Sequence, residues 1–201
     1  MNSYTIQKVA DRPNWNAIEV LSMDNRYDDT PVEMHAFAQI AYSDDSLLVH
    51  LWSENDDVRA EEYGLLGSPC NDSCLEFFFS PVNGDERYFN IEFNVNGCMY
   101  LGLASSIENL VRLLPNEECA QVFAPTIRRA DTGWEIFYTV PFAFVRRFFP
   151  DFAAKQGGAI RANCYKCADL TTPPNYLSWN PIEGETLSFH RPACFGVMYF
   201  G

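Results

Sequence analysis

The chain has 201 residues, and its 27 acidic side chains outnumber 14 basic ones, which gives a formal net charge of −13. Such a surface repels nucleic-acid phosphates and anionic lipid, so the composition excludes nucleic acid and membrane as expected partners. No window approaches the ~18 apolar residues of a membrane span. With 47% hydrophobic residues, the length fits one packed domain over residues 1–201.

The first fifteen residues carry no apolar core behind a basic start, so no secretory signal is visible. Seven cysteines are an odd number in a chain too large to depend on disulfides. These features predict reduced cysteines in a cytoplasmic protein. A chain that had lost a leader would instead be secreted.

Short runs with strand character recur between turn signals along the whole chain. The expected strands are residues 35–42 and 47–54, which form a hairpin, then 74–79, 88–95, 98–103, 121–129, 134–140, 159–167 and 194–200. A helix is expected after the capping box of Ser105 and Glu108, and a short one from Pro141 to Phe148. Residues 173–181 are expected to form a long loop. Sparse helix among many short strands predicts an all-β, two-layer antiparallel β-sandwich.

The run 88–95 is the most informative strand, because its side chains alternate in character. Phe89, Ile91, Phe93 and Val95 alternate with Tyr88, Asn90, Glu92 and Asn94. Period-two alternation places the first set on a core face and the second on a wet or polar-lined face. The turn at 96–97, Asn-Gly, supplies the left-handed backbone of a tight hairpin.

Five ordered stretches resemble the family 9-like carbohydrate-binding modules, from about His35 to Phe200. They are NDSCLEFF at 71–78, YFNIEFN at 88–94 with the following Asn-Gly, NCYKC at 163–167, PPNYLSW at 173–179, and FHRP at 189–192 with Phe195-Gly196. The resemblance implies a DOMON-like sandwich of immunoglobulin size. It also implies non-catalytic binding of a mono- or oligosaccharide. Such modules usually accompany polysaccharide-degrading activity, so the resemblance implies a role in carbohydrate catabolism.

In the better-understood members of this family, two tryptophans sandwich a terminal sugar. The resemblance places Trp179 at one of these positions. The other falls just before the Asp-Ser pair, where this chain has Pro69 and Cys70. Tyr63 or Trp52 is a candidate substitute. Sugar recognition combines an aromatic platform with polar groups at its rim, so we expect Trp179 to bind sugar, with packing under its proline-rich loop as the alternative.

Polar candidates surround this platform. Asn163, Tyr165 and Arg161 share one strand face by alternation, while Lys166 is on the other face at the strand end. Arg59 follows the second strand and offers five donors to sugar hydroxyls. The candidate binding residues are therefore Trp179, Tyr165, Lys166, Asn163, Arg59 and Trp52. Glu76, Glu92, Asn94 and Arg161 are alternatively a structural polar network, with Arg161 opposite one of the glutamates.

Two alternatives to sugar binding remain open. Glu76 and Glu92 would serve a glycoside hydrolase as its two carboxyl groups. A protein–protein module that has lost sugar binding would keep the same sandwich. We predict no cofactor and no metal: Cys164 and Cys167 should point to opposite faces, which disfavours zinc, and three histidines without an axial pair disfavour haem. A structural calcium ion stays unassigned, and oligomeric state is not predicted.

Overall fold

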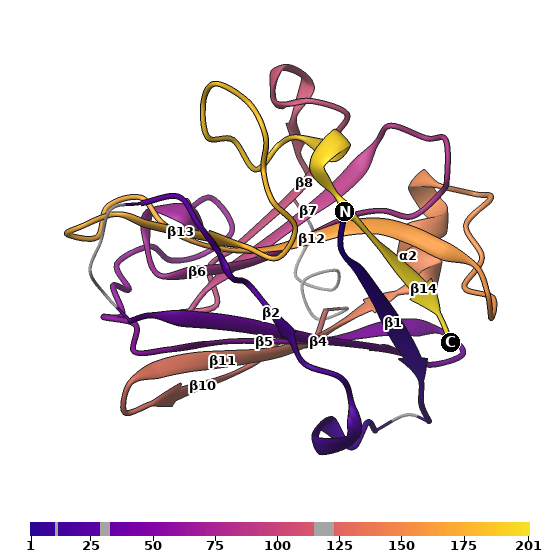
Figure 1. The fold of residues 1–201 in the computed structure, drawn as a ribbon, viewed down its shortest axis with the longest axis horizontal. Coiled ribbons are helices and arrows are strands. Elements are labelled where there is room, and N and C mark those ends of the chain that lie inside the picture. The colour runs from indigo at the N-terminus through magenta and orange to yellow at the C-terminus, as the bar shows by residue number, and fades with distance from the viewer. Residues whose placement is uncertain (11, 29–32, 115–122) are drawn as a thin grey trace.

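The computed structural model describes residues 1–10, 12–28, 33–114 and 123–201, and its strands form two β-layers (Figure 1). The first layer contains, in spatial order, β10 (Thr126–Ala130), β11 (Gly133–Pro141), β5 (Ser46–Glu54) and β4 (His35–Tyr42), with β2 (Leu21–Ser22) beside β4. All neighbours in this layer are antiparallel. The expected hairpin of residues 35–54 is confirmed.

The second layer carries the outer face that becomes the candidate site. In spatial order it contains β14 (Gly196–Phe200), β12 (Ala159–Ala168), β6 (Cys74–Ser80), β7 (Tyr88–Asn94), β8 (Met99–Ala104) and β9 (Val111–Arg112), while β13 (Asn175–Ser178) pairs with β12 and with β3 (Asn25–Arg26). Strand β1 (Ser3–Lys8) joins the layers, because it pairs in parallel with β14 and with β4. The predicted β-sandwich is confirmed.

Large apolar side chains fill the space between the two layers. From the second layer, Phe77, Phe79, Phe89, Ile91 and Phe93 point inward, and from the first, Val49, Leu51, Trp134, Ile136 and Val140. Helix α2 (Phe142–Phe148) closes one end, with the ring of Phe148 packed 5.5 Å from that of Phe89. This is the short helix expected after Pro141. None of the described helices is long and apolar enough to cross a membrane.

The other expected helix is wrong. Only one short 3₁₀ turn, Ile107–Asn109, forms there, and β9 follows it at once. The capping pair is Ser106 and Asn109, one residue later than predicted. β-branched Val111 pairs with Leu103 in the sheet, because edge pairing satisfies backbone groups that an isolated turn would leave free. Further 3₁₀ turns lie at Trp15–Ala17, Pro69–Asn71 and Pro192–Cys194.

Among the described residues, five strands were missed and one turn was predicted correctly. Strands β1, β2 and β3 lie before the first expected strand, β9 lies in the region of the expected helix, and β13 lies inside the segment expected to be a loop. The start of the strand expected at 121–129 lies outside the described residues, and its remainder is β10. Gly97 has φ +76°, the left-handed conformation that the Asn-Gly turn predicts.

Candidate functional site

A row of four facing side chains crosses the outer face of the second layer. On β12, β6, β7 and β8 they are Tyr165, Glu76, Glu92 and Tyr100, each directly opposite the next. Directly opposite residues in antiparallel strands share one face of the sheet. Alternation along residues 88–95 predicts polar side chains on this face, and they are present. Instead of being wet, however, Glu76 and Glu92 are buried, with 2% and 6% exposure.

The segment between β5 and β6 covers part of this face, and one carboxylate holds it there. Asp72 is fully buried and accepts hydrogen bonds from the backbone N–H groups of Glu61 and Glu62 at 2.9 and 2.8 Å. The amide of Asn94 on β7 donates to it at 2.7 Å, and the guanidinium of Arg59 forms an ion pair with it. Asp72 therefore ties the loop of residues 59–72 to the sheet.

A second loop, residues 179–195, covers the rest of the face. Asn163 on β12 fixes its start, because its side-chain oxygen accepts from Asn180 N at 2.8 Å and its nitrogen donates to Asn180 O at 3.0 Å. Arg191 holds the bend by donating to the carbonyls of Glu183 and Thr186, both at 2.6 Å. Gly184 lies at this bend with φ +138°, a conformation that residues with a side chain rarely adopt, and a Cβ would lie 1.3 Å from an Arg191 nitrogen.

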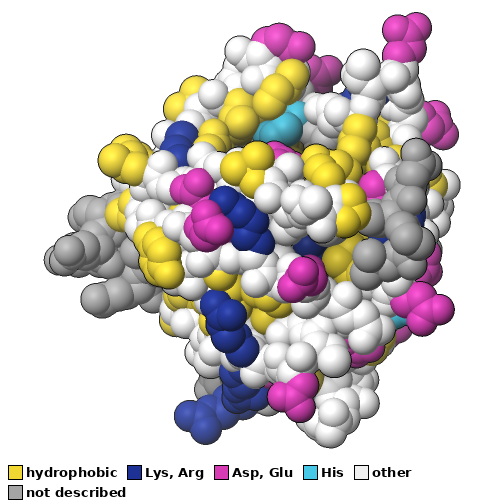
Figure 2. Space-filling model, turned by 90° about the vertical axis from the view of Figure 1, so that its left-hand side faces the viewer, with side chains coloured by type: hydrophobic (Ala, Val, Ile, Leu, Met, Phe, Trp, Pro, Cys, Tyr) yellow, Lys and Arg dark blue, Asp and Glu magenta, His cyan; other side chains and the backbone are white. Residues whose placement is uncertain are grey.

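Between the two loops lies a hollow of about 460 Å³, which we call the outer cleft. It is lined by Cys70, Glu76, Glu92, Cys167, Asp169, Tyr176, Leu187, Ser188, Phe189 and His190. Its size falls in the range of small-molecule sites. Figure 2 views the side of the molecule that lies at the left in Figure 1, and shows hydrophobic side chains around a histidine in its upper half.

Two buried glutamates, Glu76 and Glu92, form the floor of the outer cleft and are shielded from water. Burial, together with the neighbouring Glu92 carboxyl, raises the pKa of Glu76 well above its ordinary value. Burial likewise raises the pKa of Glu92 to about 7. A protonated carboxyl is both donor and acceptor, so this pair can meet a hydroxyl from either direction.

Aromatic rings form one side of the outer cleft. Phe189 stacks face to face on Tyr165, with ring centroids 4.2 Å apart and planes 7° apart, and the Tyr165 hydroxyl donates to the Phe189 carbonyl. The half-buried ring of Tyr176 meets Phe189 edge-on at 6.3 Å. Tyr176 belongs to the 173–179 motif, but the sequence pattern does not predict it as a cleft residue, because its position on β13 depends on pairing with β12.

Trp179 lies away from the outer cleft. Its side chain is only 7% exposed and belongs to the core between the layers, where a Cβ at Gly196 would come within 2.6 Å of its ring. Its edge borders a separate hollow with the N-terminal segment, residues 2–4. The structure therefore leaves it no free face for sugar stacking and favours the packing alternative.

Trp52 has its ring faces covered by neighbours. It lies on the outer side of the first layer, stacked between Phe37 at 5.1 Å and His50 at 4.6 Å. Its indole nitrogen donates to Glu54 at 3.2 Å. Tyr63, the other suggested substitute, is 68% exposed on the 59–72 loop and does not line the outer cleft.

The remaining predicted binding residues are largely committed to the fold. Lys166 is fully buried on the inner side of β12, where its ammonium contacts Asn175 Oδ1 at 2.9 Å and Asp56 at 3.5 Å. Arg161 shares its face with Asn163 as predicted. It donates, however, to the carbonyls of Ala193 and Phe195, so the expected pairing with Glu76 or Glu92 is wrong. Asn94 does belong to a polar network, but with Asp72 as its centre.

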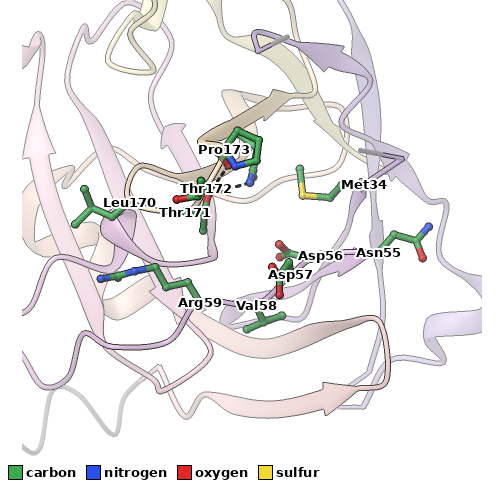
Figure 3. Close-up of a pocket in the computed structure, with 11 residues that line it drawn as sticks. Met34, Asn55, Asp56, Asp57, Val58, Arg59, Leu170, Thr171, Thr172 and Pro173 are labelled. Atoms are coloured by element: carbon green, nitrogen blue, oxygen red, sulfur yellow. Dashed lines mark hydrogen bonds between the residues drawn. The ribbon is translucent and has the colours of Figure 1, made fainter. Parts of the chain in front are cut away.

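A second hollow, of about 390 Å³, lies between residues 55–59 and 170–173, with Met34 and Asn175 completing its lining (Figure 3). Arg59, a predicted sugar contact, borders it. Figure 3 shows Asp56 and Asp57 close together on one side and Thr171 and Pro173 on the other. Among the described residues, none that lines this hollow is aromatic, so they offer no flat ring for a sugar to stack on.

The positions of the cysteines on β6 and β12 test the argument that disfavoured zinc. Cys164 faces the core and Cys167 the outer face, as alternation requires, so these two cannot share an ion. Cys74, however, lies directly opposite Cys167 and on the same face. Asp56, an acidic side chain that could offer oxygen ligands to calcium, accepts hydrogen bonds from Ser53 and Ser73. Calcium stays unassigned.

Comparison with known proteins is decisive for the family. The family model for carbohydrate-binding family 9 matches residues 9–200. The chain belongs to carbohydrate-binding family 9. No curated protein matches it.

Solved structures agree with this assignment. The crystal structure of a candidate carbohydrate-binding protein from Bacteroides uniformis is 28% identical, with a TM-score of 0.83 over 99% of each chain. Two structures of a family 9 module from Caldicellulosiruptor kristjanssonii share the fold at 10% and 9% identity. The glucose complex has a TM-score of 0.72 over 100% of this chain and 96% of that one, and the cellotriose complex 0.71 over 99% and 93%.

Replacement of Asp72 by Ala should lower the free energy of unfolding by about 3–5 kcal/mol, because it leaves buried donors and a half-buried guanidinium without their acceptor. Urea denaturation measures this. Glu61→Ala is the matched control: Glu61 pairs with the same Arg59 at 2.8 Å but is exposed. Its loss should cost less than about 1 kcal/mol. Equal effects for the two variants would contradict the role assigned to Asp72.

The imidazole of His190 should make stability depend on pH. Burial lowers its pKa to about 4, so the folded chain binds this proton less readily than the unfolded chain, whose histidine titrates near 6.5. The free energy of unfolding should therefore fall as pH drops from about 6.5 towards 4. His190→Gln keeps an acceptor for the Tyr88 hydroxyl and should show a shallower fall in urea titrations at the same pH values. Identical slopes would refute the assignment.

Proposed function

We propose that this chain binds a neutral mono- or oligosaccharide in the outer cleft and does not cleave it. The observation that carries the proposal is the composition of the cleft, in which the half-buried ring of Tyr176 borders a floor of two buried carboxyls, Glu76 and Glu92. Sugar rings present C–H faces to aromatic rings and hydroxyls to polar groups, so this pairing suits them.

Family membership supports the same position. The family resemblance places the missing second tryptophan at Pro69–Cys70, and Cys70 lines the outer cleft. A cysteine there leaves more open space than an indole, so Tyr176 is the half-buried ring available for stacking. The related structures from Caldicellulosiruptor kristjanssonii hold glucose and cellotriose, which makes these sugars the first ligands to test.

Charge indicates which sugars are suitable. Asp169 and the two glutamates line the outer cleft, and among the described residues no lysine or arginine lines it. His190 is uncharged near neutral pH, because burial lowers its pKa to about 4. Uronic acids and sulfated sugars would therefore find no compensating cation among these lining residues. Neutral sugars do not need one.

The facing pair of Glu76 and Glu92 is the feature that a glycosidase would share. Glycosidases place their two carboxyls on either side of the bond that is cleaved. Here both groups rise from neighbouring strands of one floor. This arrangement suits hydrogen bonding along one edge of a sugar, and we propose that the chain is not an enzyme.

Tyr176→Ala should weaken binding of glucose or cellotriose at least tenfold, about 1.4 kcal/mol, because the stacking surface is lost. Calorimetric titration measures the affinity. Trp52→Ala is the matched aromatic control on the first layer, and its affinity should equal that of the native chain. A loss in Trp52→Ala with no change in Tyr176→Ala would place the site elsewhere.

Two further outcomes would count against the proposal. Absence of saturable binding across a glycan array would reject sugar binding and favour the protein–protein alternative. Release of reducing sugar from cellotriose, abolished in Glu92→Gln, would show a glycosidase instead. We expect binding without release.

A further inference from the structure

Two thiols and one carboxyl meet beneath the outer cleft. Cys74 on β6 and Cys167 on β12 are directly opposite, and Glu76 follows two residues after Cys74 on the same face. One Glu76 oxygen lies 2.8 Å from the Cys167 sulfur and 3.8 Å from the Cys74 sulfur. The three donor atoms all lie within 4.8 Å of one another. They come from adjacent rows of a rigid sheet, so this convergence does not depend on a flexible loop.

We propose that Cys74, Cys167 and Glu76 bind a zinc ion or a similar borderline-soft divalent cation. Zinc takes thiolate at about 2.3 Å and carboxylate at about 2.0–2.2 Å in a tetrahedron, which separates neighbouring ligand atoms by roughly 3.5–3.8 Å. The two sulfur-to-oxygen distances, 2.8 and 3.8 Å, lie on either side of that value, so small side-chain rotations suffice. Two sulfurs disfavour calcium and magnesium, which take oxygen ligands.

The cluster lacks a cation of its own. All three side chains are at least 97% buried, with exposures of 0%, 3% and 2% for Cys74, Cys167 and Glu76. Among the residues that the structure describes, no lysine or arginine forms an ion pair with Glu76, and the hydrogen bonds found for its carboxyl come from the two thiols. A divalent ion bound by the two thiolates and the carboxylate would supply a positive charge at this point.

Glu92 is an independent sign of an unfilled polar site. It is 94% buried, directly opposite Glu76, and lines the same outer cleft. Its Oε2 atom has no hydrogen-bond partner among the described residues. Buried carboxylate oxygens are usually satisfied. A water molecule in the fourth coordination position of the metal would donate a hydrogen bond to this oxygen. Carboxylates near zinc often accept hydrogen bonds from groups bound to the metal.

The outer cleft supplies the entry path. Cys167 and Glu76 both line it, so an ion can reach the cluster from solvent without opening the sheet. The same opening leaves the fourth coordination position facing the cleft. The site thus differs from a closed four-cysteine zinc centre, because three protein ligands leave one position for water.

The test uses the whole chain, freshly reduced and stripped of metal, titrated with zinc sulfate in a calorimeter and separately with cobalt chloride. We expect one ion per chain and a thiolate-to-cobalt charge-transfer band in the near ultraviolet. Cys74→Ser and Cys167→Ser should each weaken zinc binding roughly 100-fold and abolish the band. Glu76→Gln preserves side-chain shape, so it should weaken binding without unfolding the chain, as circular dichroism checks.

Cys164→Ala is the matched control, since Cys164 is a buried thiol on the same strand that faces the opposite side. It should bind zinc like the native chain. Failure of the reduced native chain to bind zinc would overturn the proposal, as would equal loss in Cys164→Ala. A cross-linked Cys74–Cys167 peptide in the freshly purified chain would show a disulfide instead. Sugar plays no part in these measurements, so they are independent of the proposed function.

Discussion

The candidate site depends on one buried carboxylate. Asp72 accepts hydrogen bonds from two backbone N–H groups of its own loop and from the Asn94 amide of the sheet, and it forms an ion pair with Arg59. A buried charge is tolerated when it is paired and fully hydrogen-bonded, and this one is. Because loop and sheet share the same acceptor, the loop keeps a fixed position over the strands. The strand face beneath is thereby removed from solvent, and the gap that remains is the outer cleft.

Coverage by loops changes the chemistry of the floor. Polar side chains on a solvent-exposed strand would hydrogen-bond to water and keep ordinary pKa values. Under the two loops, Glu76 and Glu92 lose that water, and burial raises the pKa of both. They then require partners that bring their own hydrogen-bonding groups into the site. A sugar hydroxyl and a metal-bound water both meet that requirement, so the same two glutamates suit both a sugar and a metal ion.

Alternation within strands was predictable from the sequence, and contacts between loops were not. The inward and outward faces of β7 and β12 follow from period-two patterning, a local property. Trp179 was misplaced because its environment depends on Gly196 and the N-terminal segment, which lie far away in sequence. Tyr176 was overlooked because only pairing of β13 with β12 aims it into the cleft. The pairing of Arg161 failed because backbone carbonyls of the covering loop compete for its donors.

Strand β1 has a consequence for the order of folding. Residues 3–6 pair in parallel with residues 197–200, almost the full length of the chain apart, while residues 7–8 pair with β4. Most other sheet contacts join strands much closer in sequence and can form earlier. Closing so long a loop carries an entropic cost before any contact compensates it. We therefore expect docking of β1 against β14 to follow the formation of strand pairs that are closer in sequence.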